Sequence, residues 1–562
     1  MDVVLVGLPG SGKSVVGRRL AARNRAVFID LDEMIERTAG RGVQEIFATE
    51  GEEGFRTRER AAVATLGAPD PRPEVTRVIA TGGGTVVDPR NRWRLYRGRL
   101  PIWLDGRPEV LAQRLRRSVT VRPLVAGRDP VGAVRTLSRD RRRFYAAGQR
   151  VAGVAELRSV VEAASRLIEE HLAWTGQDGE RARGGTRLLA AETSIGSIVL
   201  GEGIAGPAIA GALAALDARR AILVSEPGAW AAAGEAIAAD LAARGRTVER
   251  VMLPKGEAAK RLSVIEAGAS ALARLRVERG EPIVAIGGGA LGDAAGFLAA
   301  SFLRGIPVIH VPTTLVAQID SSIGGKTAVD LPEGKNLVGA FHQPAAIVID
   351  VTFLRTLPDR ERRAALAEAV KMAALGDERL FALLESDGDG IAKGTRAVFE
   401  SGVVAELVER TAWAKVEIAS ADEREAGDRI RLNLGHSLGH AFEAAAGYAA
   451  LLHGEAVAYG LRAACRIGRE LDVTPPERAE RIERLLDRLG LAIRPLPYPL
   501  ATVLAMLGMD KKHAGGHLRW VLPTADGTVI RSDVPDKVVE RVAMGLLTPA
   551  AAGASAAQEG AR

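Results

Sequence analysis

Short apolar runs alternate with stretches of helical periodicity over the first 170 residues. Four runs rich in β-branched or large apolar residues, at 3–6, 27–29, 78–80 and 101–104, have the length of buried strands. The segments between them carry apolar residues at the three- and four-residue spacing of amphipathic helices. Strands that alternate with helices predict a parallel α/β domain over residues 1–172.

A second α/β series follows a polar, glycine-rich segment at 173–189, which has no apolar period and which we interpret as a linker. Its expected strands are 221–224, 248–253, 283–286 and 308–311, within a part that spans 190–356. From 357 to 546 the pattern is mainly helical, as in 361–374 and 395–419. The Ala-, Gly- and Ser-rich end, 547–562, is predicted to be disordered. No internal repeat is visible, so two different modules are joined.

Composition narrows the classes of protein that this chain can be. With 47% hydrophobic and 26% charged residues it is globular, and its one cysteine, Cys465, excludes an intramolecular disulfide and fits a reducing cytoplasm. No apolar stretch approaches the roughly 18 residues of a membrane span. The net charge of +7 suits anionic partners, but with only 4% aromatic residues we expect no nucleic-acid binding by base stacking.

Lysine is rare in this chain compared with arginine. Of 76 basic residues only 11 are lysines, and the first 250 residues contain a single one, Lys13. This lysine lies in a motif, Gly7-Leu8-Pro9-Gly10-Ser11-Gly12-Lys13-Ser14, between an expected strand and an expected helix. The spacing is that of a phosphate-binding loop, in which backbone N–H groups cradle phosphates, the lysine reaches the β- and γ-phosphates and the serine holds Mg²⁺. We therefore predict an ATP site with Mg²⁺, built from Gly7, Gly10, Ser11, Gly12, Lys13 and Ser14.

Candidate groups for a phosphate acceptor follow the loop. Asp30 and Asp32 close the second expected strand, at the sheet edge where α/β folds bind ligands. Such a pair is also common as a helix cap. Further along come Glu53-Gly54-Phe55-Arg56, Thr81-Gly82-Gly83-Gly84, Val121-Arg122-Pro123-Leu124, and Arg141 four residues before Tyr145.

Together these motifs resemble shikimate kinase over nearly the whole first module. The resemblance implies phosphorylation of the 3-hydroxyl of shikimate, with Asp30 helping to organise Mg²⁺ and Arg122 closing over the transferring phosphate as a lid residue. It places Lys13, Asp32 and Arg122 in catalysis and implies that shikimate is bound by Asp32, Arg56, Gly82, Gly83 and Arg141. Arginine forks suit the carboxylate of such a substrate, and an aspartate suits its reacting hydroxyl.

The second module carries a glycine turn and a histidine cluster. Gly287, Gly288 and Gly289 follow an expected strand and open a helix, an arrangement typical of dinucleotide binding. His436, His440 and His453 are three of the eight histidines and lie within 18 residues of one another. Two histidines with Glu368 would leave zinc an open position for a substrate oxygen, although an isolated H-x-x-x-H pair is more often structural.

These blocks, with their order and spacing, resemble 3-dehydroquinate synthase over roughly residues 190–545. The resemblance implies NAD-dependent and metal-dependent conversion of 3-deoxy-D-arabino-heptulosonate 7-phosphate to 3-dehydroquinate with phosphate release. It implies Glu368, His436 and His453 as ligands of Zn²⁺ or Co²⁺. The implied NAD contacts are Glu257, Lys260, Gly288, Gly289, Asp293, Thr313 and Thr314. The implied catalytic groups are Lys326, Lys371, Glu425 and His440, and the implied substrate contacts are Arg304, Asp320, Lys326, Lys335, Asn336, Lys415, Arg429, Asn433 and Lys511.

The family usually has an aspartate for the adenosine ribose, where this chain reads Val224-Ser225-Glu226. The resemblance also implies a homodimer, because Arg304 would reach substrate phosphate across the subunit interface. Three alternatives stay open: another sugar-phosphate cyclase, a zinc polyol dehydrogenase, or a regulatory role for one module. The expected fold is a P-loop kinase domain with a parallel sheet, then an NAD-binding α/β domain and a mainly helical metal-binding domain.

Overall fold

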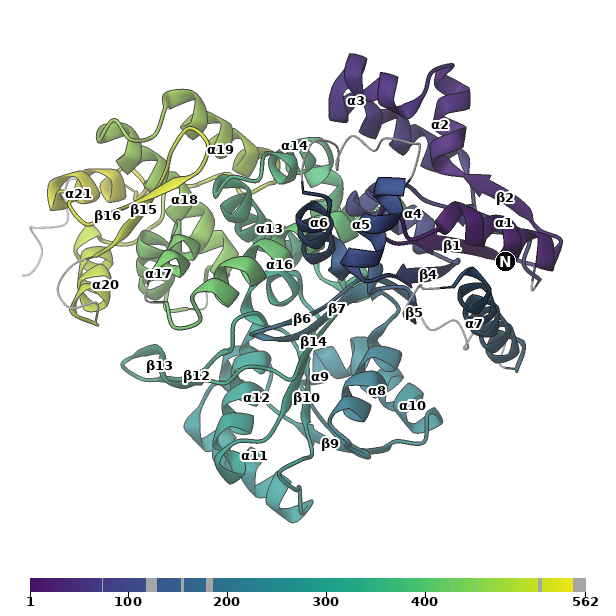
Figure 1. The fold of residues 1–562 in the computed structure, drawn as a ribbon. Coiled ribbons are helices and arrows are strands. Elements are labelled where there is room, and N and C mark those ends of the chain that lie inside the picture. Colours follow the sequence, from purple (N-terminus) through teal and green to yellow (C-terminus); the bar gives the residue numbers. More distant parts are fainter. Residues whose placement is uncertain are drawn as a thin grey trace, which may run out of the picture.

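The computed structural model describes residues 1–72, 74–117, 129–152, 156–177, 185–425, 427–448, 450–513 and 518–548. Three regions are visible in Figure 1: the first module in purple and blue, a teal α/β domain below it and a green to yellow helical part beside both. The predicted α/β, α/β and helical order of the chain is therefore confirmed.

The first module is built on a five-stranded sheet in which every neighbouring pair is parallel. Its spatial order is β2-β3-β1-β4-β5. All four strands expected from the apolar runs are present. The elements are β1 (Asp2–Val6), α1 (Lys13–Asn24), β2 (Val27–Asp30), α2 (Leu31–Ala39), α3 (Val43–Thr65), β3 (Arg77–Ala80), the 3₁₀ turn η1 (Thr85–Val87), α4 (Pro89–Tyr96), β4 (Leu100–Asp105), α5 (Pro108–Arg117), α6 (Pro130–Tyr145), β5 (Gln149–Ala152) and α7 (Leu157–Gln177).

The α/β domain of the second module has a seven-stranded sheet of order β6-β7-β14-β11-β10-β8-β9. Only the β6/β7 pair in it is antiparallel. The strands are β6 (Thr186–Thr193), β7 (Gly196–Glu202), β8 (Arg220–Ser225), β9 (Thr247–Met252), β10 (Ile283–Gly287), β11 (Val308–Pro312) and β14 (Ala346–Asp350), with the hairpin β12 (Lys326–Leu331) and β13 (Gly334–Phe341) outside the sheet. The helices are α8 (Ala205–Ala215), α9 (Pro227–Ala229), α10 (Glu235–Ala243), α11 (Leu262–Arg274) and α12 (Gly289–Ser301).

The last part is helical apart from one small hairpin. Its elements are α13 (Asp359–Ala374), α14 (Glu378–Lys393), α15 (Arg396–Glu400), α16 (Val403–Ala421), α17 (His436–Ala445), α18 (His453–Glu470), α19 (Pro476–Arg488), α20 (Leu500–His513), β15 (Trp520–Pro523), β16 (Thr528–Arg531) and α21 (Asp536–Met544). The helical pattern at 395–419 corresponds to two helices, because Gly402 adopts φ 80° and separates α15 from α16. Gly402 has the conformational freedom that this break requires.

Three predicted boundaries also need correction. Helix α7 continues to Gln177 and β6 begins at Thr186, so both ends of the linker predicted at 173–189 belong to regular elements and the first domain does not end at 172. The predicted tail 547–562 begins too early: Leu547 forms a β-bridge with Leu496, and Thr548 donates its backbone N–H to the Leu496 carbonyl. The rest of that tail, 549–562, lies outside the described residues.

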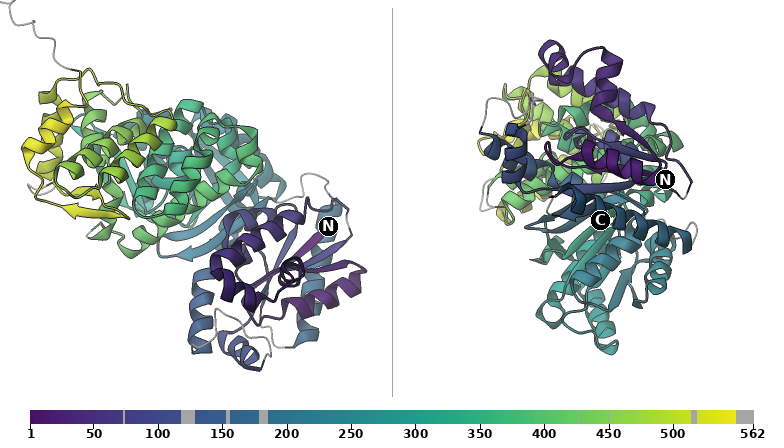
Figure 2. Two further views of the ribbon diagram at one scale, coloured as in Figure 1. Left: turned by 90° about the horizontal axis from the view of Figure 1, so that it is seen from above. Right: turned by 45° about the vertical axis from the view of Figure 1, so that its right-hand side comes forward.

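The two modules pack against each other. One cluster of buried apolar side chains includes Trp93 and Tyr96 of α4, Leu188 of β6, and Val404 and Val408 of α16. The two views of Figure 2 likewise show the first module seated against the rest of the chain. A core that crosses the module boundary joins the two modules more firmly than a flexible linker does. Within the described residues, no helix has the length and apolar character needed to cross a membrane.

Candidate active sites

The loop between β1 and α1 has the curled backbone that its glycines predict. Gly7, Gly10 and Gly12 all have positive φ, at 144°, 83° and 89°. Lys13 is the first residue of α1, and its Nζ donates to the carbonyls of Gly7, at 2.8 Å, and Leu8, at 3.1 Å. The ammonium is therefore held inside the loop at a helix N-terminus, where phosphate binding is favourable. Ser11 lies in the loop, and Ser14 is the second residue of α1.

Asp30 is the last residue of β2, and Asp32 lies in the first turn of α2. Asp30 caps helix α2, because its Oδ1 accepts the backbone N–H of Asp32 at 3.1 Å and of Glu33 at 3.5 Å. The capping interpretation is therefore confirmed, and a role of Asp30 in Mg²⁺ binding stays a prediction. Asp32 lies against the glycine loop after β3: a Cβ on Gly82 would lie 2.9 Å from Asp32 Oδ1. Gly82 therefore permits the close approach of this carboxylate.

Arg56 reaches the same glycine loop from helix α3. A Cβ on Gly84 would lie 2.5 Å from Arg56 Nη2. Arg56 Nη1 contacts Glu59 Oε2 at 2.9 Å, and Thr85 donates to Glu59 Oε1 at 2.7 Å. Only 1% of Glu59 is exposed. Sequence reasoning missed Glu59, although its position three residues after Arg56 places both on one face of a helix.

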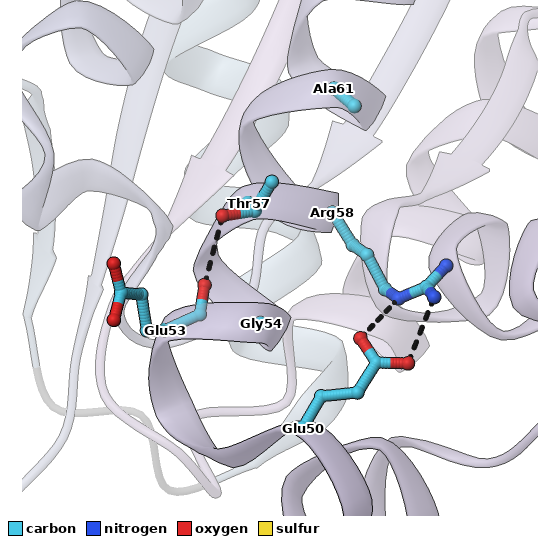
Figure 3. Close-up of a pocket in the computed structure, with 6 residues that line it drawn as sticks. All are labelled: Glu50, Glu53, Gly54, Thr57, Arg58 and Ala61. Carbon is cyan, nitrogen blue, oxygen red and sulfur yellow. Dashed lines mark hydrogen bonds and ion pairs between the residues drawn. The ribbon is translucent and has the colours of Figure 1, made fainter.

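Helix α3 bends at Gly51, which has φ 70° and ψ −172°. A pocket opens next to the bend, shown in Figure 3, and is lined by Glu50, Glu53, Gly54, Thr57, Arg58 and Ala61. Arg58 makes two contacts with the Glu50 carboxylate there, at 2.8 and 2.9 Å. Arg58 is therefore paired with Glu50, and this pocket does not present it to a ligand as a free cation.

Helix α6 completes the first site. Arg141 Nη1 and the Tyr145 hydroxyl both donate to the carbonyl of Gly83, at 3.0 and 2.5 Å. Burial raises the pKa of Tyr145 to about 12, which keeps the hydroxyl protonated as a donor. The structure thus gathers Asp32, Arg56, Gly82, Gly83 and Arg141 around one glycine loop. Arg122 lies outside the described residues.

The glycine turn of the second module follows β10 and starts helix α12. Gly288 is the N-cap, with a Cβ position 3.1 Å from Thr314 Cγ2, and Gly289 faces Ser321 Oγ at 2.8 Å. Thr313 donates its backbone N–H to Gly287 at 2.9 Å. These side chains pack closely on the glycine turn, which lies at the N-terminus of α12, a position that favours phosphate binding.

Acidic and basic groups adjoin this turn. Lys260 Nζ lies 2.8 Å from Asp293 Oδ2 and also donates to Asn336 Oδ1. Glu257 pairs with Lys335 at 3.0 Å. Glu226 accepts the backbone N–H of Gly256 at 2.7 Å, so this glutamate, in the place of the family's usual aspartate, holds a turn in the structure.

Three side chains from three helices meet as predicted for a metal centre. Glu368 lies in α13, His436 starts α17 and His453 starts α18. Their candidate ligand atoms all lie within 4.8 Å of one another. His453 Nε2 is 3.2 Å and His436 Nε2 is 3.5 Å from Glu368 Oε1. One carboxylate and two imidazoles are the donor set of a catalytic zinc site, so these residues fit such an ion.

The charges around the cluster explain its pKa values. Burial lowers the pKa of His436 to about 3, so this imidazole is neutral, as a ligand must be. Burial lowers the pKa of His453 too, but hydrogen bonds to Glu368 and Glu443 outweigh it and raise the pKa to about 10. A bound cation would take the place of that proton.

Glu443 was not predicted from the sequence, yet its Oε2 contacts His453 Nδ1 at 3.2 Å. A carboxylate behind a ligating histidine fixes the ring orientation. His440 and Glu443 also form a second candidate group with His453. His440 is exposed beside the cluster, with its ring centroid 5.2 Å from that of His436, and its role in catalysis stays a prediction.

Basic side chains surround the metal cluster. Lys371 Nζ lies 2.5 Å from Glu368 Oε2 and 3.4 Å from Asp320 Oδ1, and Lys415 Nζ lies 2.9 Å from the same Asp320 oxygen. Burial lowers the pKa of Lys415, and Asp320 opposes that effect. Lys335 Nζ reaches Glu443 Oε1 at 2.9 Å, which links the turn near Glu257 to the metal cluster.

A further group lies between the hairpin β12/β13 and the turn η8 (Asp428–Asn433). Glu425 pairs with Lys326 and accepts from Asn433 Nδ2 at 2.9 Å, and Arg429 donates to the Gly324 carbonyl at 3.0 Å. Arg304 ends the turn η5 (Phe302–Arg304), is exposed and has φ 66°. Lys511 lies in α20, but its side chain is outside the described residues.

Comparisons with known proteins match this geometry module by module. A shikimate kinase profile matches residues 9–171, and profiles of the N-terminal and C-terminal parts of 3-dehydroquinate synthase match 250–364 and 365–513. The chain is 45% identical over 333 residues to the 3-dehydroquinate synthase of Symbiobacterium thermophilum, a match that covers 59% of this chain and 90% of that one. It is 43% identical over 315 residues to the enzyme of Halorhodospira halophila, with 56% and 86% covered.

Among solved structures, the second module resembles 2-epi-5-epi-valiolone synthase from Streptomyces hygroscopicus subsp. jinggangensis, which has NAD⁺ and Zn²⁺ bound. The match has a TM-score of 0.57 and 28% identity, and covers 62% of this chain and 96% of the other.

Proposed function

This chain belongs to the 3-dehydroquinate synthase family and carries a shikimate kinase domain ahead of the synthase, and we propose that each reaction proceeds at its own site through the residues described above. Both activities are steps of the shikimate pathway. The two reactions are not consecutive in that pathway, so direct transfer of an intermediate between the two sites has no chemical basis.

In the kinase module, we assign the phosphates of ATP to the loop from Gly7 to Ser14 and shikimate to the glycine loop after β3. The convergence of Asp32, Arg56 and Arg141 on that loop carries the proposal. The two arginines would bind the carboxylate by charge-assisted hydrogen bonds, and Asp32 would orient the 3-hydroxyl. Lys13 would neutralise charge on the transferring phosphoryl group, and Ser14 with Asp30 would hold Mg²⁺.

In the synthase module, Glu368, His436 and His453 would hold Zn²⁺ or Co²⁺, and the approach of their ligand atoms within 4.8 Å carries the proposal. The ion would supply a Lewis acid for a hydroxyl of the substrate, and NAD⁺ would supply a hydride acceptor. Glu443 would fix the His453 ring. Lys260 and Asp293 would border the dinucleotide, which the helix N-terminus at Gly288 would bind by a phosphate.

The remaining polar residues would bind the sugar phosphate. Lys371 and Lys415, paired with Asp320, would offer cations to the substrate's anionic groups, and Arg429 would favour a substrate that has a carboxylate. Holding the substrate by its phosphate and by its carboxylate would fix the sugar ring against the metal and the nicotinamide, where positioning contributes most to the rate. Lys326, Glu425 and Asn433 would border the same substrate, with His440 near its phosphate.

The competing functions make different products. A polyol dehydrogenase would release NADH, whereas a cyclase recycles it, so sustained absorbance growth at 340 nm during turnover would overturn the synthase assignment. A cyclase of another specificity would turn over a sugar phosphate that lacks a carboxylate. The purified chain should instead form 3-dehydroquinate from the heptulosonate phosphate, and shikimate phosphate from shikimate and ATP.

We further propose that the chain is a cytoplasmic homodimer, joined through the synthase module. The exposed position of Arg304 supports a contact with a second copy. Light scattering on the purified protein tests the dimer, and an Arg304→Ala variant tests whether the arginine contributes to substrate affinity across the interface.

A further inference from the structure

The kinase module contacts the synthase module through helix α4, which lies against α16. Arg90 of α4 pairs with Glu406 of α16 at 2.6 Å. A Cβ on Gly402, just before α16, would lie 2.7 Å from the Trp93 ring. A further ion pair joins Arg97, directly after α4, to Glu202 of β7 at 3.2 Å. Polar and apolar contacts thus hold the two modules in one fixed arrangement.

Arg92 is the most buried cation of this interface. Its side chain is 0% exposed, and its Nη2 pairs with Glu409 of α16. The other terminal nitrogen, Nη1, donates to the carbonyl of Val86 and, at 3.3 Å, to that of Val87. These carbonyls belong to the turn that follows Gly82, Gly83 and Gly84. One guanidinium therefore ties a synthase carboxylate to the backbone next to the proposed shikimate site.

Helix α6, which carries Arg141 of the proposed shikimate site, also contacts α16. Arg143 of α6 places its guanidinium 4.3 Å from the ring centroid of Trp413 in α16. Two residues before it is Arg141, which donates to Gly83, and two residues after it is Tyr145, which donates to the same carbonyl. Contacts from α16 thus reach the turn after the glycine loop and also helix α6, which forms hydrogen bonds with that loop.

The charge of Glu409 is what makes Arg92 an effective tether. A buried guanidinium without a counter-charge is strongly disfavoured, and the cost appears when one partner of a buried pair is removed. Hydrogen bonds to charged groups are also stronger than neutral ones in a low-dielectric interior. Without Glu409, Arg92 would be drawn toward water and would release the carbonyls of Val86 and Val87.

We propose that Glu409, a residue of the synthase module, is a positioning residue for the kinase reaction: through Arg92 it fixes the backbone that follows the shikimate-binding glycine loop. Trp413 supports the same site through Arg143. The inference rests on the proposed assignment of shikimate to Asp32, Arg56 and Arg141.

The test uses the full chain with a Glu409→Gln substitution. Shikimate affinity, measured by calorimetric titration without ATP, should weaken about fivefold, as expected for loss of a coupling contact, and the KM for shikimate should rise in parallel. The KM for ATP and the synthase turnover should keep their wild-type values. A variant whose shikimate affinity equals that of the wild type would overturn the proposal.

Arg90→Gln is the matched control, because it breaks an ion pair of the same interface that does not reach the glycine loop. Glu406 keeps Arg379, at 3.2 Å, and Arg410, at 3.0 Å, as partners in that variant. Its shikimate affinity should be unchanged. An equal loss in Arg90→Gln and Glu409→Gln would show that docking in general, and not Glu409, sets the affinity, and would also overturn the proposal.

Two further variants separate this inference from the assignment beneath it. Trp413→Leu should weaken shikimate binding in the same direction, and it replaces Glu409→Gln as the test if the latter does not fold; wild-type affinity would then count against the proposal. Arg141→Gln should lose shikimate binding whatever the synthase module does. Retained binding in Arg141→Gln would refute the shikimate site itself, whereas its loss, together with wild-type affinity in Glu409→Gln, would refute only the positioning role.

Discussion

Lys415 contacts Asp320 twice: its Nζ lies 2.9 Å from the carboxylate oxygen Oδ1 and 2.8 Å from the backbone carbonyl oxygen. The lysine comes from α16 and the aspartate from the short π-helix η6 (Ala317–Ser321). Lys371 shares the same carboxylate. Lys371 also pairs with Glu368, so Lys415 is the buried cation of this cluster whose ion pair is with Asp320. A buried cation of this kind suits an anionic substrate.

Lys415→Met should therefore impair the synthase. We expect kcat/KM for the sugar phosphate to fall about 100-fold, as for a lost positioning contact, while kinase turnover is unchanged. The fold should survive, because Asp320 keeps Lys371. Lys393→Met is the matched control: that lysine is 61% exposed and pairs only with Asp389 on the surface. Equal synthase rates in the two variants would contradict the role of Lys415.

Lys13→Ala should abolish phosphorylation of shikimate. The ammonium supplies the charge that the phosphate loop presents to the transferring group, and we expect a loss of about 1,000-fold or more. Formation of 3-dehydroquinate by the same sample should be unaffected, because Lys13 belongs to the phosphate loop of the kinase module, where its Nζ donates to the carbonyls of Gly7 and Leu8. Loss of both activities would show that the sites depend on one another through the nucleotide.

Chelation should remove the synthase activity, and added Zn²⁺ or Co²⁺ should restore it. The reason is the Glu368, His436 and His453 cluster, whose candidate ligand atoms lie within 4.8 Å of one another. Kinase activity, assayed with excess Mg²⁺, should persist. Elemental analysis of the untreated protein should give about one transition-metal ion per chain; a metal-free protein with full synthase activity would refute the site.

Stability of the synthase module should fall between pH 6.5 and pH 5. Burial lowers the pKa of His310 to about 4, with a smaller contribution from His342. In that window the unfolded chain binds a proton at His310 that the folded chain does not, so acid favours unfolding, by up to about 1.4 kcal/mol per pH unit. Urea midpoints should show this loss in the wild type and a smaller loss in His310→Gln.

Urea midpoints of His342→Gln at pH 6.5 and at pH 5 give the comparison. Its pH dependence should stay close to that of the wild type, because burial of His310 is the larger cause. Identical slopes in the wild type and in His310→Gln would contradict the assignment to His310.

Much of the two sites could be predicted from the sequence because the motifs are local. The loop around Lys13 follows from glycine positions within eight residues, and the spacing of His436 and His440 places them on one helix. Glu368 could be joined to them only through the family resemblance, since α13 is distant in the sequence. Glu59 and Glu443 were missed for a physical reason: a buried acid next to a cation has no sequence pattern of its own and is identified by its surroundings.

The packing of the modules was also beyond the sequence. The polar segment near 173–189 indicated two units joined by a linker, and no periodicity shows that Arg92 and Glu409, more than 300 residues apart, form a buried pair. Arginine on a helix is ordinarily read as solvated. Similarly, Gly402 packs closely against the Trp93 ring of the other module, a contact that a local pattern does not contain.

The core that α4, β6 and α16 share should make the two modules lose their structure together. When one module opens, it exposes Trp93 or Val404 and removes the counter-charge of a buried partner in the other. Kinase and synthase activity should therefore be lost at the same rate, both on heating and during proteolysis. A cell that makes this chain keeps the two pathway steps in a one-to-one ratio throughout the life of the protein, and not only at its synthesis.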